Sequence, residues 1–431
     1  MMRSETSPTE VIRGHESSEQ SVTQLGFVPA SSVRSRFLNM KFVHPFPARM
    51  APELAMSALK ELPRGTRVLD PMMGSGTTVL SARLRGHEGV GIDRDPLAVL
   101  IAQASCRDLD APLLAREAAR LLKNSRQAYR SISKGDAYPL GADEETRAFI
   151  RYWFDDTARR QLAAIMGELT TGDYDVKTFL KIAVSRMIIT KEIGVSLAED
   201  VSHSRPHRTR DLSPVLPFDV FMQSVNTISK NAHFKGTTGL LQARAIRGDC
   251  RNLPFEDGEF DYILTSPPYL NAIDYLRGHK MSLVWLGYQI DDLRDIRSTN
   301  IGTDRGSSME TYDNIVKLMV DDVEALTPKL RNTLRLYVRD LSKTIGEMRR
   351  VIANGGTALF VVGDCTIRGV DVRNSAAVNA IARDNGFDHV SKVRRPLPPS
   401  RRYLPPPSKR SSMHALRKRM RDELILKYRA G

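Results

Sequence analysis

The sequence predicts an α/β protein built on a mostly parallel, doubly wound sheet that is interrupted by a helical insertion. Strand and helix patterns alternate over residues 66–105, with a glycine-rich turn after the first strand. The alternation is missing over most of residues 107–245, where helical patterns follow one another, and it returns with a strand at 243–249. Alternating strands and helices are typical of parallel sheets covered by helices on both faces.

The first half of the sheet is predicted from residues 66–105. TRVLD (66–70) is a short apolar strand, PMMGSGTT (71–78) is a glycine-rich turn, and VLSARLRG (79–86) is a helix that ends at a glycine. HEGVGID (87–93) is a second strand, and RDPLAVLIAQAS (94–105) begins another helix. A strand, a glycine loop, a helix and a strand with an acid at its end form half of a nucleotide-binding sheet.

Residues 107–245 are expected to form a helical insertion that serves as a DNA-recognition region. EETRAFIRYWFDDTARRQLAAIMGEL (144–169) and VKTFLKIAVSRMIITKEIG (176–194) are helical patterns, and no strand is expected among them. The polar, basic segment EDVSHSRPHRTRD (199–211) interrupts these helices.

The second half of the sheet completes a catalytic domain assigned to residues 37–106 and 246–431. A long helical region is expected around 311–353 and a helix ended by a glycine at 375–386. The expected strands are ARAIRGD (243–249), FDYILTS (260–266), GGTALFVVGD (355–364) and DELILKYR (422–429).

The composition indicates a soluble, cytoplasmic protein. No run of 18 apolar residues exists, so a membrane span is not expected. Residues 1–36 are polar and contain acids, which predicts a disordered segment rather than a signal peptide. The three cysteines lie far apart and form no CxxC pair, which argues against a disulfide framework or a cysteine-rich metal site.

The formal charge of +14 is concentrated at the C-terminal end. Residues 392–431 hold 13 Lys or Arg against Asp422 and Glu423. This pattern fits either a solvated surface or a surface that binds a polyanion. Four basic residues of this stretch are candidates for DNA binding, namely Arg401, Arg402, Lys409 and Arg410.

The insertion contains a second candidate DNA-binding group, which consists of Arg205, His207, Arg208 and Arg210. The alternative is that these side chains are exposed to water and bind nothing. Pro206 disrupts any helical pairing of His203 with His207, so we expect no metal site.

The turn DPMMGSGTT (70–78) is a candidate ligand-binding loop. Glycine allows backbone to approach a ligand closely, and the following helix N-terminus supplies donors. The turn lacks the lysine of a phosphate-binding P-loop and matches GxGxxG poorly. A ligand that carries a carboxylate and an amino group suits Asp70 beside this loop.

Asp93, at the end of the second strand, is placed to accept ribose hydroxyls. Asp249, at the end of the third strand, is placed to meet a base edge.

The stretch TSPPY (265–269) follows the strand DYIL directly, so it lies at a strand's carboxyl end, where open α/β sheets bind ligands. The two prolines fix the backbone, so the Ser266 hydroxyl and the neighbouring carbonyl become fixed acceptors. Tyr269 offers a flat aromatic face. Acceptors beside a stacking ring suit an aromatic base that bears an amino group and has been taken out of its duplex.

Together these residues resemble the amino-methylating DNA methyltransferases. DPMMGSGTT, GIDRDP, RGD and TSPPY are similar to motifs I to IV of that family, and HPFPARMAPELA (44–55) is similar to its segment over the cofactor's methionine end. The resemblance covers residues 37–106 and 243–430 and implies a class I, Rossmann-like methyltransferase fold that uses S-adenosylmethionine. It implies that the cofactor is bound by His44, Pro45, Asp70, Pro71, Gly74, Ser75, Gly76, Thr77, Thr78, Asp93, Asp249 and Cys250.

The same resemblance implies that Ser266, Pro267, Pro268 and Tyr269 are catalytic. In that family an SPP form of the fourth motif usually accompanies methylation of cytosine N4, so we expect a site-specific N4-cytosine DNA methyltransferase. Double-stranded DNA is the expected partner, with a cognate restriction endonuclease as a further one and association with the nucleoid as a consequence. The alternatives are adenine N6 methylation, guanine N2 methylation of RNA, and a DNA-binding module with a degenerate cofactor site. The helical insertion between the second and third motifs fits no standard motif order, which leaves the recognition region open.

Overall fold

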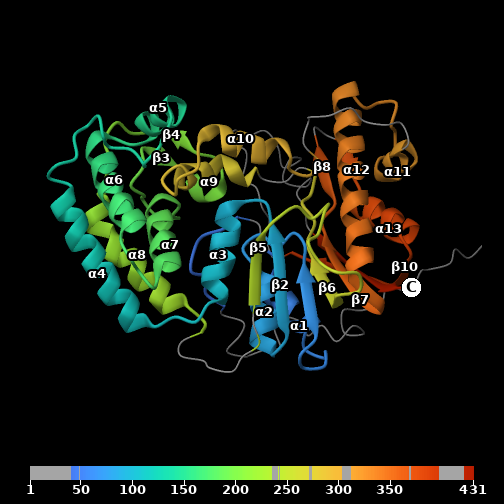
Figure 1. Ribbon diagram of the computed structural model, residues 1–431. Helices are drawn as coiled ribbons and strands as arrows, with labels where there is room; N and C mark the ends of the chain where they lie inside the picture. Colours follow the sequence, from blue (N-terminus) through green and yellow to red (C-terminus); the bar gives the residue numbers. More distant parts are fainter. Residues whose placement is uncertain are drawn as a thin grey trace, which may run out of the picture.

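The structure, a computed structural model, describes residues 40–47, 49–234, 241, 243–270, 274–302, 312–367, 370–397 and 422–431. A seven-stranded sheet lies at its centre with helices on both faces (Figure 1). The strands in spatial order are β10 (Phe387–Pro396), β11 (Asp422–Ala430), β7 (Ile352–Val362), β6 (Phe260–Thr265), β1 (Arg67–Asp70), β2 (Glu88–Asp93) and β5 (Ala243–Arg247).

Strands β5, β2, β1, β6 and β7 are parallel, whereas β11 is antiparallel to both of its neighbours. Because β2 lies on one side of β1 and β6 on the other, the strand order reverses at β1 and a crevice forms at the carboxyl ends of these strands. The insertion of β11 beside β7 completes the strand order of the class I, Rossmann-like methyltransferase fold. The predicted fold class is therefore confirmed.

The sheet separates two hydrophobic cores, because side chains along a strand alternate between its faces. Val68, Tyr262 and Leu264 pack with helix α1 (Pro52–Ala58) and with Ala82 of α2 (Thr77–Arg85). Leu69 and Ile263 pack on the opposite face. The helices of that face are α11 (Asp313–Met319), α12 (Pro328–Val351) and α13 (Asn374–Asp384).

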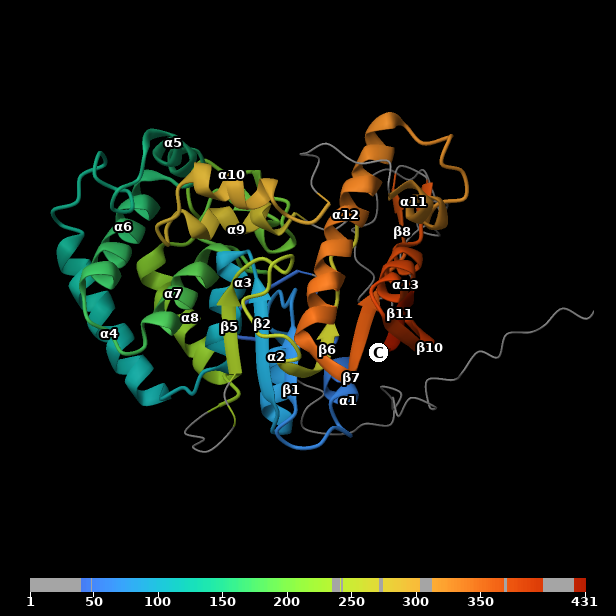
Figure 2. The same cartoon turned by 45° about the vertical axis from the view of Figure 1, so that its right-hand side comes forward.

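A layer of five helices follows α3 (Pro96–Cys106) and lies beside the sheet, on the left of Figure 1 and of the turned view in Figure 2. Its helices are α4 (Ala111–Ala128), α5 (Glu144–Trp153), α6 (Asp156–Thr171), α7 (Lys177–Ile188) and α8 (Pro217–Asn231). Aspartates begin three of them, because the carboxylates of Asp110, Asp143 and Asp155 accept otherwise unpaired N–H groups. The layer shares one core with α3, α9 (Tyr275–Leu283) and α10 (Ile290–Ser298), so it is packed directly against the sheet domain.

The expectation of no strand in this region was wrong. The segment contains a short antiparallel pair of strands, β3 (Ala198–Glu199) and β4 (His207–Arg208), around the 3-10 turn η2 (Val201–His203). Two-residue strands are too short to produce an alternating pattern in the sequence. The sheet resumes at Ala243, the first residue of the strand expected at 243–249, and Ala243 pairs with Gly89 of β2.

The remaining strands are β8 (Cys365–Ile367) and β9 (Val370–Val372), which pair with each other after β7. Within the described ranges, no helix combines the length and the apolar character needed to cross a membrane.

Candidate active site

The glycine-rich loop after β1 is held in a conformation that needs glycine. Gly74 and Gly76 have φ angles of +51° and +78°, in the left-handed region that other residues avoid. A Cβ atom on Gly76 would lie 2.7 Å from the Cβ of Ala102 on α3. Helix α3 therefore packs directly against the loop. Pro71, Ser75, Thr77 and Thr78, also predicted to bind the cofactor, are buried within this turn and the start of α2.

Asp70 lies at the end of β1 and is only 3% exposed. Its Oδ1 accepts hydrogen bonds from the Thr265 hydroxyl at 2.7 Å and from the Met72 amide at 3.2 Å. Burial raises the pKa of Asp70 to about 6, against the smaller opposing effect of these hydrogen bonds. Among the described residues no cation pairs with it. The crevice thus contains a carboxylate without a positive partner.

Asp93 occupies the equivalent position at the end of β2. Its carboxylate accepts the Gly74 amide and the Asp95 amide, both at 2.9 Å. Desolvation, together with the negative charge of Asp95, raises the pKa of Asp93 to about 7. No cation in the described part of the chain pairs with Asp93 either. The hydrogen bond to Gly74 fixes the glycine loop to the end of β2.

The catalytic candidates follow β6, the strand beside β1. Leu69 of β1 lies opposite Ile263 of β6, which places Thr265 at the end of β1 and explains its hydrogen bond to Asp70. Ser266 is the next residue, and its side chain shares a hydrogen bond with the Tyr269 hydroxyl. Burial raises the pKa of Tyr269 well above its ordinary value, so its hydroxyl stays protonated. Pro267 and Pro268 lie between them, and Pro267 is buried.

Residues 44–47 contact the glycine loop through Phe46, which was not predicted as a site residue. His44 is buried, with Nδ1 2.6 Å from the Pro45 carbonyl and Nε2 2.8 Å from the Ser185 hydroxyl on α7. Since a carbonyl only accepts, Nδ1 carries the proton, and burial lowers the pKa of His44 well below its ordinary value. His44 therefore anchors the segment to α7, while the Phe46 ring contacts Gly74, 3.3 Å from where its Cβ would lie.

Asp95 and His279 are two further residues that were not predicted to belong to the site. Asp95 caps α3 through a hydrogen bond from the Leu97 amide, and its second oxygen pairs with Nδ1 of His279 on α9. The His279 ring is buried beside Phe46, with 5.3 Å between ring centroids. Asp95 belongs to the recognised GIDRDP motif, but no sequence signal marks His279, 184 residues later. The pair attaches α9 to the end of β2.

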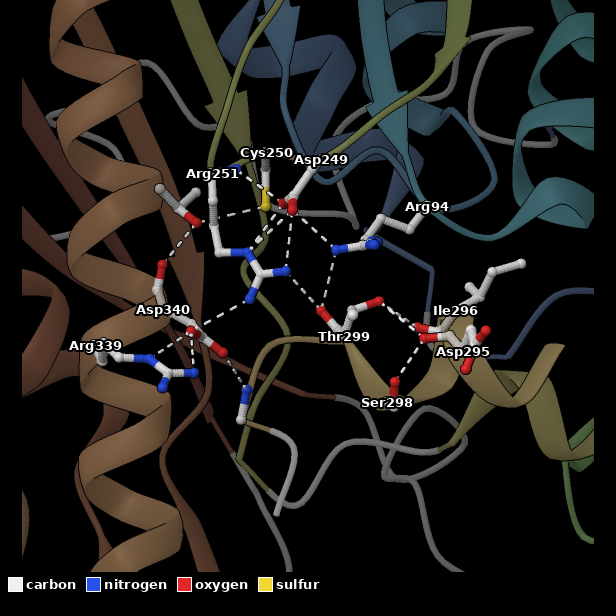
Figure 3. A network of polar contacts seen from close by, with 12 residues as sticks. Arg94, Asp249, Cys250, Arg251, Asp295, Ile296, Ser298, Thr299, Arg339 and Asp340 are labelled. Atoms are coloured by element: carbon white, nitrogen blue, oxygen red, sulfur yellow. Dashed lines mark hydrogen bonds and ion pairs between the residues drawn. The ribbon is translucent and has the colours of Figure 1, made fainter. Parts of the chain in front are cut away.

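Asp249, at the end of β5, belongs to a network of ion pairs (Figure 3). It pairs with Arg94 at 2.8 Å and with Arg251 at 3.0 Å, and both arginines also donate to the Thr299 carbonyl after α10. Arg251 continues to Asp340 on α12 at 3.2 Å. Burial pushes the pKa of Asp249 upward, but hydrogen bonds from Arg251 hold it below its usual value. Asp249 is thus an ionised acceptor at the crevice with two arginines already bound.

Cys250 follows Asp249 and is buried, with its sulfur 3.4 Å from the Thr344 hydroxyl on α12. Burial raises the pKa of the thiol to about 12, so it is protonated at neutral pH. The Cys250 side chain is therefore engaged with α12, and its part in cofactor binding stays a prediction.

The structure describes the insertion group of DNA-binding candidates but not the C-terminal group. Arg208 pairs with Asp211 at 3.1 Å, Arg210 pairs with Glu199, and Nδ1 of His207 lies 3.2 Å from the Arg205 carbonyl. Arg205 is exposed and has no ion pair within the ranges that the structure describes. The C-terminal group, Arg401, Arg402, Lys409 and Arg410, lies outside the described residues. In the described part of the chain, no cluster of three His, Cys, Asp or Glu side chains is arranged to hold a metal ion.

Comparison with known proteins identifies distant relatives. The chain is 23% identical to the Type II methyltransferase M.MvaI of Kocuria varians over 417 residues, covering 89% of each chain. It is 24% identical to the Type II methyltransferase M.BsoBI of Geobacillus stearothermophilus over 299 residues, covering 58% of this chain and 53% of that relative. No family model matches the chain.

A solved S-adenosylmethionine-dependent methyltransferase from Methanosarcina mazei is 9% identical, with a TM-score of 0.31 and coverage of 86% of this chain and 94% of that one. This TM-score is low, so the fold assignment is based on the strand order of the sheet.

Proposed function

We propose that this protein is an S-adenosylmethionine-dependent DNA methyltransferase that modifies the exocyclic N4 amine of a flipped-out cytosine. The distant relatives are Type II methyltransferases, which supports a DNA-modifying methyltransferase. We extend the proposal to double-stranded DNA as the substrate, to action on the nucleoid in the cytoplasm, and to a cognate restriction endonuclease as a cellular partner. Identification of the methylated nucleoside after incubation with plasmid DNA tests the reaction.

The observation that carries this proposal is the pair of desolvated carboxylates at the ends of β1 and β2. Asp70 and Asp93 have raised pKa values and no cationic partner among the described residues. Desolvated carboxylates are costly unless a ligand supplies donors or positive charge. S-adenosylmethionine carries an ammonium group that suits Asp70 and two ribose hydroxyls that suit Asp93. The glycine loop lies between them, and glycine allows a ligand to approach the backbone closely.

Bound S-adenosylmethionine supplies an electrophilic methyl group, and the residues of this chain supply orientation. An exocyclic amine is a poor nucleophile because its lone pair is delocalised into the ring. Ser266 and the Pro267 carbonyl accept the N–H groups of this amine and draw its nitrogen toward sp³ geometry. The Ser266 hydroxyl also shares a hydrogen bond with the Tyr269 hydroxyl, which fixes its orientation. The Tyr269 ring holds the base by stacking, so orientation and electrostatics lower the barrier.

Ser266 supports cytosine N4 over adenine N6, because the resemblance associates SPP at this position with cytosine. Adenine N6 is the second candidate, since the same acceptors fit the amino group of either base.

The affinity for S-adenosylmethionine should rise as the pH is raised from 5.5 to 7.5. At pH 5.5 most Asp70 and Asp93 side chains are protonated, because their pKa values are about 6 and about 7, and both ionise as the pH rises. Only the ionised forms attract the ammonium group and accept from both hydroxyls. We expect the Kd, measured by isothermal titration calorimetry, to fall about tenfold or more over this range, since one pK unit corresponds to about 1.4 kcal/mol.

Without cofactor, the contribution of these two carboxyl groups to the stability of the fold should decrease as the pH is raised. A folded-state pKa above the unfolded value means that these two groups favour folding below about pH 4, and that this contribution is lost as the pH rises through 6 to 7. The increase in Tm caused by S-adenosylmethionine should therefore be larger at pH 7.5 than at pH 5.5. A Kd that is independent of pH would show that neither carboxylate meets the cofactor.

A further inference from the structure

The short hairpin at residues 198–210, here called the insertion hairpin, is docked on the helix that follows the TSPPY motif. The hairpin contains β3, η2 and β4, and α9 begins six residues after Tyr269. Ser204 is 3% exposed and donates from Oγ to the Tyr275 carbonyl at 2.8 Å. The Gly278 amide donates to Ser204 Oγ at 3.3 Å. These contacts fix the hairpin on the first turns of α9.

The docking depends on the absence of a side chain at Gly278. A Cβ atom there would lie 2.6 Å from the Val201 carbonyl oxygen and 3.0 Å from Ser204 Oγ. Both neighbours belong to the hairpin, and the closer one is backbone, which does not rotate out of the way. Glycine at position 278 therefore allows the backbones of the hairpin and α9 to approach this closely, and any side chain there would push them apart.

The hairpin also holds strained backbone. Asp200 and Ser204 have φ angles of +55° and +56°, and they are the two non-glycine residues with positive φ in the part of the chain that the structure describes. They stand on either side of η2 and set the path of the chain into the tip. Strained conformations persist where the surrounding structure enforces them, and they cluster at functional sites.

The side chains at the tip are exposed and basic. His203, Arg205, His207 and Arg208 are exposed. Acidic residues hold Arg208 and Arg210, through Asp211 and Glu199, so these arginines stabilise the shape of the hairpin. Arg205 has no ion pair among the described residues, and His207 keeps Nε2 unengaged there. These two side chains are presented outward by a fixed scaffold.

The place of the hairpin in the molecule links it to the proposed target site. In Figures 1 and 2, α9 and α10 lie beyond the carboxyl ends of the sheet strands, the edge at which TSPPY leaves β6, and in Figure 1 β3 and β4 are drawn near α5 and α9. Helix α9 also contacts residues next to the glycine loop. His279 pairs with Asp95 at the start of α3, and Tyr275 packs on Phe46, the ring that contacts Gly74, with ring centroids 5.2 Å apart. One helix thus joins the hairpin to the crevice.

We propose that the insertion hairpin reads the DNA sequence beside the target base, with Arg205 and His207 contacting base edges. A two-stranded ribbon fits the major groove, and an arginine guanidinium matches the two acceptors of guanine. This inference rests on the proposed DNA methyltransferase function and names its sequence-reading element. The charge pairs within the hairpin fix its geometry, and Gly278 fixes its distance from the catalytic motif.

The test uses the full-length protein and a library of duplexes in which a random segment surrounds the cytosine. The methylated fraction and, separately, the protein-bound fraction are sequenced for the wild type and for Arg205→Ala, Arg205→Lys and His207→Ala. Arg116→Ala, an exposed arginine on the outer helix α4, is the matched control. Calorimetry with S-adenosylmethionine on each variant checks the cofactor site independently.

We expect Arg205→Ala and Arg205→Lys to lose discrimination at one or two base pairs by about 5- to 150-fold, and His207→Ala at a neighbouring one, with S-adenosylmethionine affinity unchanged. Lysine keeps the charge but not the two-pronged geometry, so it should not restore the preference. Arg116→Ala should keep the wild-type preference. Because the bound fraction is sequenced as well, a variant that methylates no DNA still reports its preference.

Several results would overturn the inference. An unchanged preference in all three hairpin variants would exclude base reading by the hairpin. A uniform loss of binding with the same preference and a weaker salt dependence, or full rescue by lysine, would assign Arg205 to phosphate contact only. If the wild type itself methylates no DNA, the proposed function fails, and that outcome is distinct from a wild type that methylates with a preference its hairpin variants retain.

Discussion

Replacing Ser266 with alanine is expected to lower the rate of methyl transfer by about 100- to 1000-fold, the usual effect of removing one preorganised hydrogen-bonding group at a reacting centre. The Ser266 oxygen accepts from the amine only while the base is in the site, so its loss leaves cofactor binding intact. Single-turnover methylation of duplex DNA measures the rate, and calorimetry measures the Kd for S-adenosylmethionine, which should change less than about threefold.

Two substitutions of Tyr269 separate the contribution of its hydroxyl from that of its aromatic ring. Tyr269→Phe keeps the ring and removes the hydroxyl that shares a hydrogen bond with Ser266. Tyr269→Ala removes the ring as well and should cost a further 1–3 kcal/mol, roughly the value of stacking one base on an aromatic side chain. The expected order of rates is wild type, Tyr269→Phe, Tyr269→Ala. A Ser266→Ala protein that loses cofactor affinity but keeps its rate would contradict the roles proposed for this motif.

Replacing Asp93 with asparagine is expected to weaken S-adenosylmethionine binding by about 10- to 150-fold, because a hydrogen bond to a charged group contributes about 1.5–3 kcal/mol. Asparagine has the same shape and one remaining acceptor, so the hydrogen bonds from Gly74 and Asp95 are only partly lost. Calorimetry measures the affinity, and the pH dependence of the Kd should also be smaller in this variant.

Asp384→Asn, at an exposed position on α13, is the matched control and should bind S-adenosylmethionine as the wild type does. Binding of duplex DNA in the absence of cofactor should be unchanged in both variants. Wild-type cofactor affinity in Asp93→Asn would remove Asp93 from the cofactor site and, with it, half of the observation on which the proposal depends.

The part of the site that could be predicted from the sequence is the part encoded locally at strand ends. Asp70, Gly74 and Gly76 follow β1, Asp93 ends β2, and Ser266 follows β6. The carboxyl ends of parallel strands meet at one edge of a sheet, so recognising each strand and its neighbour was sufficient to bring these residues together. The hydrogen bonds of Asp70 to Thr265 and of Asp93 to Gly74 agree with that reasoning.

The remaining residues depend on contacts between distant segments that carry no local pattern. His279 meets Asp95 only because α9 packs over the end of β2. The network around Asp249 requires the end of β2 with Arg94, the segment 249–251 and the end of α10 to converge. The insertion hairpin has strands of two residues, and it can dock on α9 because Gly278 has no side chain. None of these features changes the hydrophobic periodicity from which elements are predicted.

The central claim is that the TSPPY crevice methylates the N4 amine of cytosine in DNA, and the identity of the labelled nucleoside tests it most directly. The protein is incubated with tritiated S-adenosylmethionine and plasmid DNA, the DNA is digested to nucleosides, and the labelled nucleoside is identified by chromatography. We expect the label in N4-methyldeoxycytidine, and about 100- to 1000-fold slower labelling in a parallel reaction with Ser266→Ala. Label in N6-methyldeoxyadenosine, or label that appears only when RNA replaces DNA, would contradict the claim.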